Sequence, residues 1–243
     1  MSDKKISRRD ALRLAGGLGI VAAPLLLAWR GTRGAMTPKE GVLGAVEHAN
    51  TSVEELLYSG AEVSYADLTP EMGWPSYHVA PGDNPPIQPP GWRLKIGGMV
   101  DRPLSLTLEE LIAMEKTTLR LEHHCVEGWS AVADWTGVRL AELAKRAGAR
   151  KTDYVEFRSF DGPPDERGYW SSWDRESAVH PQTLIAFGFN GKPLTPKHGA
   201  PVRLYGASKL GYKQVKHLTE INFLDRETGG YWENRGYEWF GGT

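Results

Sequence analysis

Cysteine is almost absent from this sequence. Cys125 is the only cysteine among the 243 residues, so no intramolecular disulfide can form and no Cys-x-x-Cys-His motif can attach a haem. A closed zinc site usually shows paired cysteines or histidines at short spacing, a pattern that the sequence lacks. In an extended segment His123 and Cys125 point to one face and His124 points to the other, so these three side chains cannot ligate one metal together.

Strong charge of one sign, internal repeats and low-complexity tracts are also lacking. The whole chain carries a net charge of −1, and the 22 basic and 28 acidic residues beyond residue 34 leave that part at −6. A mildly acidic body gives no electrostatic reason to bind nucleic acid. The 28 glycines and 16 prolines indicate many turns between short elements rather than a helical bundle.

The N-terminal residues are typical of an export signal. Residues 1–34 carry seven basic and two acidic side chains, and the pair Arg8-Arg9 precedes an uncharged apolar run from Leu14 to Trp29. This arrangement predicts export by the twin-arginine route, to the periplasm or the outer face of the cytoplasmic membrane. The 16-residue run is shorter than the roughly 20 residues of a spanning helix. No Ala-x-Ala cleavage motif follows it, so the segment is either a removed signal or a retained N-terminal anchor associated with the membrane.

Hydrophobic spacing predicts short helices and strands after this segment. Helices are expected at 51–57, where Thr51 and Glu54 form a capping box, at 108–112, and at 140–147 with Gly148 as a stop. Strands are expected at 92–96, 119–124, 154–160 and 184–189, the last followed by an Asn-Gly hairpin turn. Length and composition allow one large domain or two small ones; we expect a helical linker over 35–64, followed by a domain over 65–243 whose bounds rest on the resemblance described below.

Cys125 lies where the strand 119–124 runs into a loop, a usual place for reactive groups. A lone cysteine is most often a small apolar core residue. Two sharper alternatives are a nucleophilic thiolate of a cysteine hydrolase, paired with His198 or His217, and a soft thiolate ligand to a metal held mainly by something other than protein. Residue type and spacing leave all three open.

An ordered set of motifs distinguishes these alternatives. They are Cys-x-Glu-x-Trp-Ser at Cys125 to Ser130, Trp135-x-Gly137, Asn190-Gly191-x-Pro193-Leu194, His198-Gly-x-Pro-x-Arg203 and Gly211-Tyr-Lys-x-x-Lys216. From about Tyr65 to the C-terminus the sequence resembles the molybdenum-cofactor domain of the sulfite oxidase family, especially the exported prokaryotic branch that includes methionine sulfoxide reductase catalytic subunits. The resemblance implies a loop-rich α+β fold with mixed sheets, which binds molybdenum with one molybdopterin.

The resemblance also implies roles for particular residues. Cys125 would supply a thiolate to molybdenum, a soft donor for a metal already rich in sulfur. Tyr169 would line the substrate pocket and hydrogen-bond an oxyanion or relay a proton. The remaining matched positions would hold the pterin and its phosphate: Tyr77, His78, Ser159, His198, Arg203, Gln214, Val215 and Lys216.

Two departures from the family pattern bear on the reaction. The arginine that many relatives place just after the early tyrosine is absent, since Tyr77 is followed by His78, Val79 and Ala80. A sulfite site needs converging cations, so this absence favours reduction of a small-molecule S-oxide or N-oxide over oxidation of a small anion such as sulfite. Without a haem-attachment motif, electrons are expected to come from a separate haem membrane protein or soluble cytochrome. A cysteine hydrolase, and a cofactor-binding or electron-relay protein without turnover, remain the alternatives.

Overall fold

The computed structural model describes residues 41–57, 60–71, 73–79, 84–162 and 168–243. The predicted export signal and its twin arginine lie outside these residues. The chain divides into two compact units, Met1–Leu56 and Leu57–Thr243. Within the described ranges, no helix is long and apolar enough to cross a membrane.

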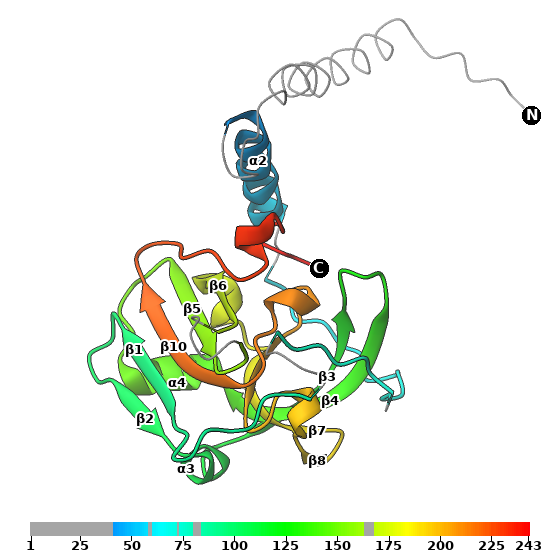
Figure 1. Ribbon diagram of the computed structural model, residues 1–243, viewed down its shortest axis with the longest axis vertical. Helices are drawn as coiled ribbons and strands as arrows, with labels where there is room; N and C mark the ends of the chain where they lie inside the picture. The colour runs from blue at the N-terminus through cyan, green and yellow to red at the C-terminus, as the bar shows by residue number, and fades with distance from the viewer. Residues whose placement is uncertain (1–40, 58–59, 72, 80–83, 163–167) are drawn as a thin grey trace, which may run out of the picture. The chain divides into compact units, whose positions relative to one another are not determined.

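The described part of the first unit is the helix α2, which spans Gly41–Leu57 (Figure 1). The prediction that a capping box at Thr51 begins this helix is wrong, because Thr51 lies in its interior. Alanine, leucine and glutamate in 41–50 favour continued helix, and they outweigh the two glycines there. A Ser/Thr-x-x-Glu pattern therefore does not mark a helix start when helical residues precede it.

The second unit contains two five-stranded sheets. The first has the order β2-β1-β10-β5-β6, with β1 and β10 parallel and the other neighbours antiparallel (Figure 1). Its strands are β1 (Leu94–Gly98), β2 (Leu104–Leu106), β5 (Tyr154–Ser159), β6 (Trp170–Asp174) and β10 (Leu218–Leu224). The parallel pair joins strands from opposite ends of the domain. The sheet is therefore complete only when β10, from the C-terminal part of the domain, lies between β1 and β5.

The second sheet is antiparallel and has the order β3-β4-β7-β8, with β9 also paired to β7. Its strands are β3 (Thr117–His124), β4 (Ser130–Arg139), β7 (Thr183–Phe189), β8 (Lys192–Pro193) and β9 (Arg203–Gly206). The helices of the unit are short: α3 (Leu108–Ile112), α4 (Leu140–Ala147), α5 (Arg175–Ala178), η1 (Pro196–His198), η2 (Gly211–Lys213) and η3 (Glu233–Arg235).

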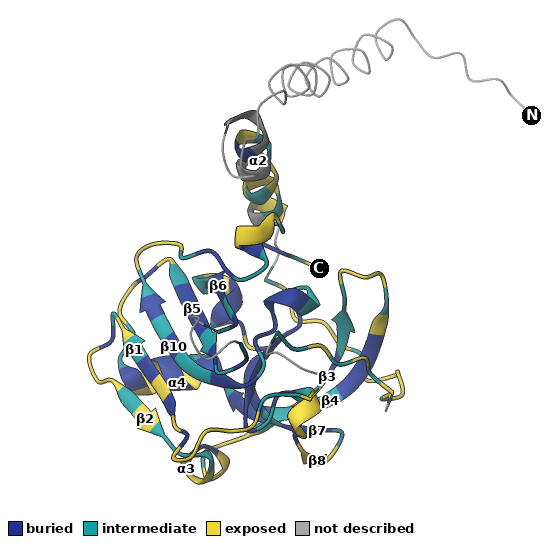
Figure 2. Cartoon of the chain, in the orientation of Figure 1, coloured by how far each residue is buried: buried dark blue, intermediate teal, exposed yellow. Residues whose placement is uncertain are grey.

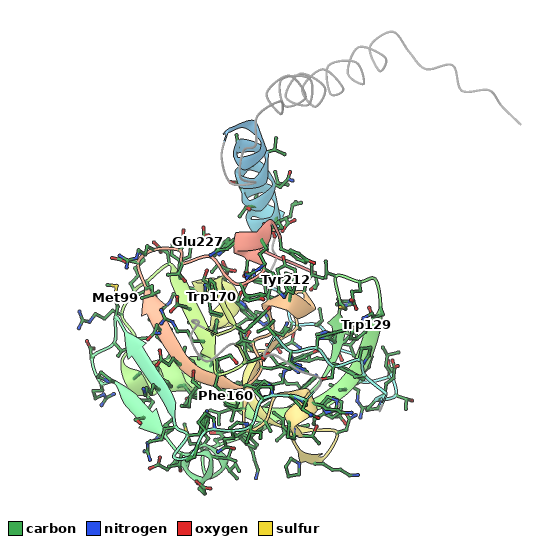
Figure 3. All side chains as sticks on the ribbon, viewed as in Figure 1. Met99, Trp129, Phe160, Trp170, Tyr212 and Glu227 are labelled. Carbon is green, nitrogen blue, oxygen red and sulfur yellow. The ribbon has the colours of Figure 1, made fainter. Side chains whose placement is uncertain are left out.

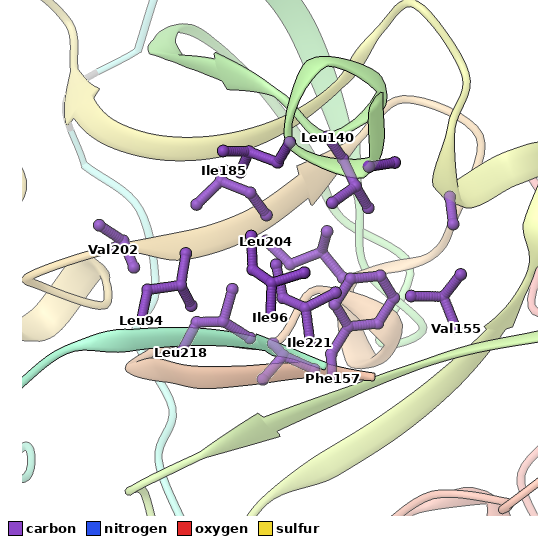
Figure 4. Close-up of a cluster of buried hydrophobic side chains, with 14 of the residues drawn as sticks. Leu94, Ile96, Leu140, Val155, Phe157, Ile185, Val202, Leu204, Leu218 and Ile221 are labelled. Atoms are coloured by element: carbon purple, nitrogen blue, oxygen red, sulfur yellow. The ribbon is translucent and has the colours of Figure 1, made fainter. Parts of the chain in front are cut away.

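Both faces of the second sheet are buried where β7 and β9 run. Ile185 and Leu204 contribute to the larger core, which also contains Leu140 of α4 and the inward residues of the first sheet, such as Ile96 (Figure 4). Figure 2 shows buried stretches on strands of both sheets. On the opposite face Tyr205 joins a second, aromatic-rich core cluster. Alternation of side chains along a strand explains why neighbouring residues enter different cores. The aromatic-rich core lies on the side from which the functional site is built.

Several predicted elements are confirmed. Helix α3 covers the predicted residues, and Thr107 and Glu110 form a capping box at its start. Helix α4 ends at Gly148, which adopts the left-handed conformation with φ of 64°. The predicted Asn190-Gly191 turn joins β7 to β8, with positive φ at both residues as a type I′ turn requires. Local signals of this kind depend only on neighbouring residues, which explains their success.

Candidate active site

The tip of the β3–β4 hairpin presents Cys125. The amide of Cys125 donates to the carbonyl of Trp129 at 2.9 Å, and the amide of Gly128 donates to the carbonyl of Cys125 at 3.0 Å. Gly128 has φ of 86°, and a side chain there would meet no atom within 4 Å. The turn therefore requires glycine for its backbone conformation rather than for space. Strand pairing up to His124 and Ser130 fixes the base of this turn.

A cavity of about 420 Å³ opens at this turn. Eight of the ten predicted site residues line it: Tyr77, His78, Cys125, Tyr169, His198, Arg203, Gln214 and Lys216. His123 lines it as well, and His124 instead lies 2.9 Å from the hydroxyl of Ser130. The predicted alternation of His123 and His124 between two faces is thus confirmed. The cavity is large enough for a small organic cofactor.

Arg203 places a buried positive charge in the cavity. Its side chain is only 6% exposed, and its guanidinium lies 4.9 Å from the centre of the Trp135 ring. Its hydrogen bonds go to the backbone carbonyls of Leu204, His198 and Gln214 at 3.2–3.4 Å, which is long. Burial lowers the pKa of Arg203 to about 10, so the group stays charged at neutral pH.

Lys216 adds a second cation to the same cavity. Its ammonium donates to the carbonyl of Tyr77 and, at 3.4 Å, to that of Lys197. Burial and the neighbouring charge of Arg203 lower the pKa of Lys216 to about 8, with Asp161 acting in the opposite direction. No described residue forms an ion pair with Lys216 or Arg203. Two cations without a carboxylate partner make the cavity suited to an anion.

His198 contributes a neutral side chain beside these cations. Burial, together with Arg203 and Lys216, lowers its pKa. Its ring stacks on Phe189 with 4.5 Å between centroids, and Nδ1 lies 3.0 Å from the hydroxyl of Thr195. The imidazole is therefore oriented by two contacts from the β7–η1 region.

The Cys125 thiol lies next to a carboxylate. Its Sγ is 3.9 Å from Oε2 of Glu127. Burial raises the pKa of the Cys125 thiol, and the charge of Glu127 raises it further. A hydrolase nucleophile needs a lowered thiol pKa and an adjacent base such as histidine, so these surroundings argue against the cysteine-hydrolase alternative.

Glu127 also joins two distant parts of the chain. Its Oε2 accepts hydrogen bonds from the hydroxyl of Tyr77 at 2.8 Å and from Nε1 of Trp129 at 3.1 Å. These two bonds, Trp129 first, lower the pKa of Glu127, which keeps it ionised at neutral pH. The carboxylate thus ties the segment 73–79 to the cysteine turn.

Tyr169 is a buried residue in the lining of the cavity. Its hydroxyl donates to the carbonyl of Tyr212, and burial and Glu233 raise its pKa well above the usual value. Figure 3 labels Tyr212 on η2 and Trp129 in the β3–β4 hairpin, two of the regions that line the cavity. The Tyr169 hydroxyl has one proton, and it already donates this proton to the Tyr212 carbonyl. To donate a hydrogen bond to an oxyanion, as predicted, Tyr169 would have to give up its bond to Tyr212.

Two predicted cofactor residues, Ser159 and Val215, do not line the cavity. The Ser159 hydroxyl accepts from the amide of Asp161 at 2.8 Å, and the Asp161 carboxylate in turn accepts from the amide of Val79 at 3.0 Å. Val215 is fully buried in the larger core. Ser159 therefore supports a cavity residue, Asp161, rather than reaching the cavity itself.

Gln214 lines the cavity, but its side chain amide mainly shapes the loop after β9. Its Oε1 accepts from the amide of Gly206, and its Nε2 donates to the carbonyls of Gly206 and Lys209 at 2.7 Å. Its backbone carbonyl accepts the bond from Arg203. Gln214 accordingly holds Arg203 and the loop in place.

The sequence prediction missed several lining residues. They are Trp74, His123, Glu127, Trp129, Asp161, Lys197, Tyr212, Trp232 and Tyr237, among others. Glu127 belongs to the quoted cysteine motif and could have been assigned from its position two residues after Cys125. Trp232 and Tyr237 follow the last motif, and no local pattern marks them as cavity residues.

Comparison with known proteins identifies the family. The family described as oxidoreductase molybdopterin binding domain matches residues 66–232. The chain belongs to this family. The predicted α+β molybdopterin-binding fold, and the implied molybdenum–molybdopterin cofactor, are thereby confirmed. The matched residues carry the whole set of ordered motifs and nearly all of the cavity.

Individual relatives agree with this assignment. The chain is 40% identical over 156 residues to a protein-methionine-sulfoxide reductase catalytic subunit of Xanthomonas axonopodis pv. citri, covering 59% of this chain and 48% of the relative. A catalytic subunit of the same name from Gluconobacter oxydans is 30% identical over 245 residues, covering 95% of this chain and 73% of the relative. The chain thus spans about half the length of the first of these relatives.

A solved structure shares the fold. The sulfane dehydrogenase SoxCD from Paracoccus pantotrophus superposes with a TM-score of 0.51 at 25% identity, over 56% of this chain and 39% of that chain. This likeness supports the α+β fold with mixed sheets and few helices.

The cavity fits the cofactor that the family implies. Within the part of the chain that the structure describes, it combines a thiol, two cations that form no ion pair and the buried Nδ1 of His123, which has no hydrogen-bond partner. The described residues contain no group of three or more His, Cys, Asp or Glu that could hold a metal ion. A pterin with a phosphate group would provide the anion for the two cations. A pterin that supplies most of the metal's ligands would also explain why the described residues contain no metal-binding cluster of their own.

Proposed function

We propose that the chain is a mononuclear molybdenum oxidoreductase that reduces an S-oxide or N-oxide by two-electron oxo transfer. The observation that carries this proposal is that one cavity contains the only cysteine together with Arg203 and Lys216, two cations that form no ion pair with any described residue. The relatives are named as methionine-sulfoxide reductase catalytic subunits, which favours an S-oxide. When bound, the molybdenum cofactor supplies the redox chemistry at this cavity.

Each residue of the cavity would have a separate role in binding the cofactor or the substrate. Cys125 would donate its thiolate to the metal. Arg203 and Lys216 would bind the cofactor's phosphate, since a guanidinium fork and an ammonium suit such an anion. His198 and His78 would contact the pterin from the same cavity. Tyr169 would line the pocket.

Sulfite-type oxidation on the same site is the alternative reaction. The arginine expected after Tyr77 is absent, and the carboxylate of Glu127 lies beside the thiol. Both features weaken binding of a dianion and support reduction of a neutral oxide. The cysteine-hydrolase alternative is disfavoured by family membership and by the raised pKa of Cys125.

We infer further that the chain is exported through Arg8-Arg9 and takes electrons from a separate haem protein or cytochrome. Residues 1–34 would act as signal or anchor, 35–64 as a linker and 65–243 as the cofactor domain. Both relatives described above are called catalytic subunits, which accords with a separate electron donor. Replacing both arginines by lysine and fractionating the cells tests the export route, and export of the double variant at parental levels would contradict it.

Elemental analysis and a substrate screen test the catalytic proposal. Protein purified after native export should contain about one molybdenum per chain and reduce a sulfoxide or trimethylamine N-oxide with a reduced viologen as electron donor. Cys125→Ser should lose turnover and keep much of its pterin, whereas Thr118→Ser, on the same hairpin and outside the cavity, should retain activity. Absence of molybdenum, or full turnover by Cys125→Ser, would overturn the proposal.

A further inference from the structure

Charged side chains of both signs line the cavity. Arg203 and Lys216 would meet the cofactor's phosphate, Asp161 acts electrostatically on Lys216, and Glu127 lies on the exposed turn beside Cys125. A bound phosphate would neutralise the two cations, whereas no described cation pairs with Glu127. The negative charge at the turn would then face whatever approaches the thiolate side of the site.

Contacts hold the Glu127 carboxylate in this position. Its Oε2 accepts from Tyr77 at 2.8 Å and from Trp129 at 3.1 Å and stands 3.9 Å from the Cys125 sulfur. Three neighbouring groups therefore contact the same carboxylate oxygen. A glutamate on an exposed turn normally samples several rotamers, and anchors from two separate segments restrict that freedom.

We propose that Glu127 selects substrates by charge, admitting neutral oxides and repelling anions from the thiolate side of the cavity. This inference deepens the proposed function, on which its meaning for substrate choice rests. The substrate class that follows is uncharged at the oxygen-bearing group, as sulfoxides are. Because Glu127 is exposed and screened by water, its effect is moderate and depends on salt.

The single cysteine permits a test that needs no catalysis. Iodoacetate and iodoacetamide both react when the thiolate displaces iodide to form a thioether, and they differ in that the first carries a carboxylate. The ratio of their two rates on the same full-length, cofactor-free protein cancels the fraction of thiolate, so it reports the electrostatic potential at the sulfur. All labelling is at Cys125, because the chain has no other cysteine.

Glu127→Gln is the informative variant, because glutamine keeps an oxygen that can accept from Tyr77 and Trp129. The iodoacetate-to-iodoacetamide ratio should rise about threefold to tenfold, as expected for removing one charge about 4 Å away in a largely aqueous setting. The increase should shrink in 1 M salt. Glu115→Gln removes the same charge at an exposed site near the far end of β3, roughly 25 Å away along the strand, and should leave the ratio unchanged.

A second measurement uses the molybdenum-loaded protein, with sulfate as the dianion probe. Glu127→Gln should bind sulfate more tightly in competition with a sulfoxide, and Glu115→Gln should not. An unchanged alkylation ratio, or an equal rise in Glu115→Gln, would overturn the inference. If the ratio rises as expected but the loaded protein reduces no oxide, the charge selection stands and the proposed reaction fails.

Discussion

The hydroxyl of Tyr77 lies 2.8 Å from the Glu127 carboxylate, across 50 residues of sequence. The same segment is fixed by Lys216, which donates to the Tyr77 carbonyl, and by Asp161, which accepts from the Val79 amide. One wall of the cavity is therefore a loop without helix or strand, held by side chains from three separate regions. Its position depends on few contacts, each of which can be removed singly.

Tyr77→Phe should disturb function more than stability. The lost hydrogen bond is exposed to water, so the free energy of unfolding should change little. The freed loop and the freed Glu127 should raise KM for the oxide substrate, while the molybdenum content stays near that of the parent. Steady-state kinetics and urea unfolding measure the two effects. A loss of molybdenum equal to the loss of activity would instead assign Tyr77 to cofactor retention.

Arg203→Lys should lower cofactor content although it preserves charge. Lysine cannot form the planar guanidinium fork and does not reproduce the stacking on Trp135. We expect the molybdenum content of the purified protein to fall about tenfold, measured by elemental analysis with pterin fluorescence. Arg150→Lys, in an exposed ion pair with Asp101, is the matched control and should keep its content. Equal contents in both variants would contradict a role for Arg203 in binding.

Anion binding to the empty cavity should weaken as the pH rises through about 8. Lys216 has a pKa lowered to about 8, so its positive charge is present below that pH and is lost above it. Sulfate is a suitable probe because it stays a dianion throughout the range from pH 7 to 9. Isothermal titration calorimetry should show a fall in affinity over this range, and Lys216→Met should bind weakly at every pH. A pH-dependent step that persists in Lys216→Met would assign the effect to another group.

Glu233→Gln should destabilise the fold. Lys213 and Glu233 are fully buried, and the Lys213 ammonium lies 2.6 Å from the Glu233 carboxylate. Glutamine keeps an oxygen that can accept from that ammonium but removes the negative charge that balances it, so the buried cation has no counter-charge and we expect a loss of roughly 3 kcal/mol in urea unfolding.

A paired replacement tests the cause of this loss. Lys213→Met with Glu233→Leu removes both charges, so it should recover much of the lost stability. Tyr237 and Trp232 line the cavity beside this pair, so Glu233→Gln should also reduce cofactor content. A double variant as unstable as Glu233→Gln would show that packing, rather than an unpaired charge, is responsible.

The sequence by itself determined the features that depend on neighbouring residues. The alternation of His123 and His124, the helix that ends at Gly148 and the turn at Asn190-Gly191 follow from local sterics and hydrogen bonding, and each agrees with the structure. The ordered motifs around Cys125 were sufficient to indicate the family.

Tertiary structure decided what depends on contacts between distant segments. It brought Glu127 to Tyr77 and added Trp232 and Tyr237 to the cavity, while Ser159 took a supporting position behind it. Sequence spacing carries no information on such contacts, because they form only after both sheets pack and the C-terminal segment closes over the site. Local motifs thus identify Cys125, Arg203 and Lys216. Packing of the whole domain decides which carboxylate and which aromatic side chains surround them in the cavity.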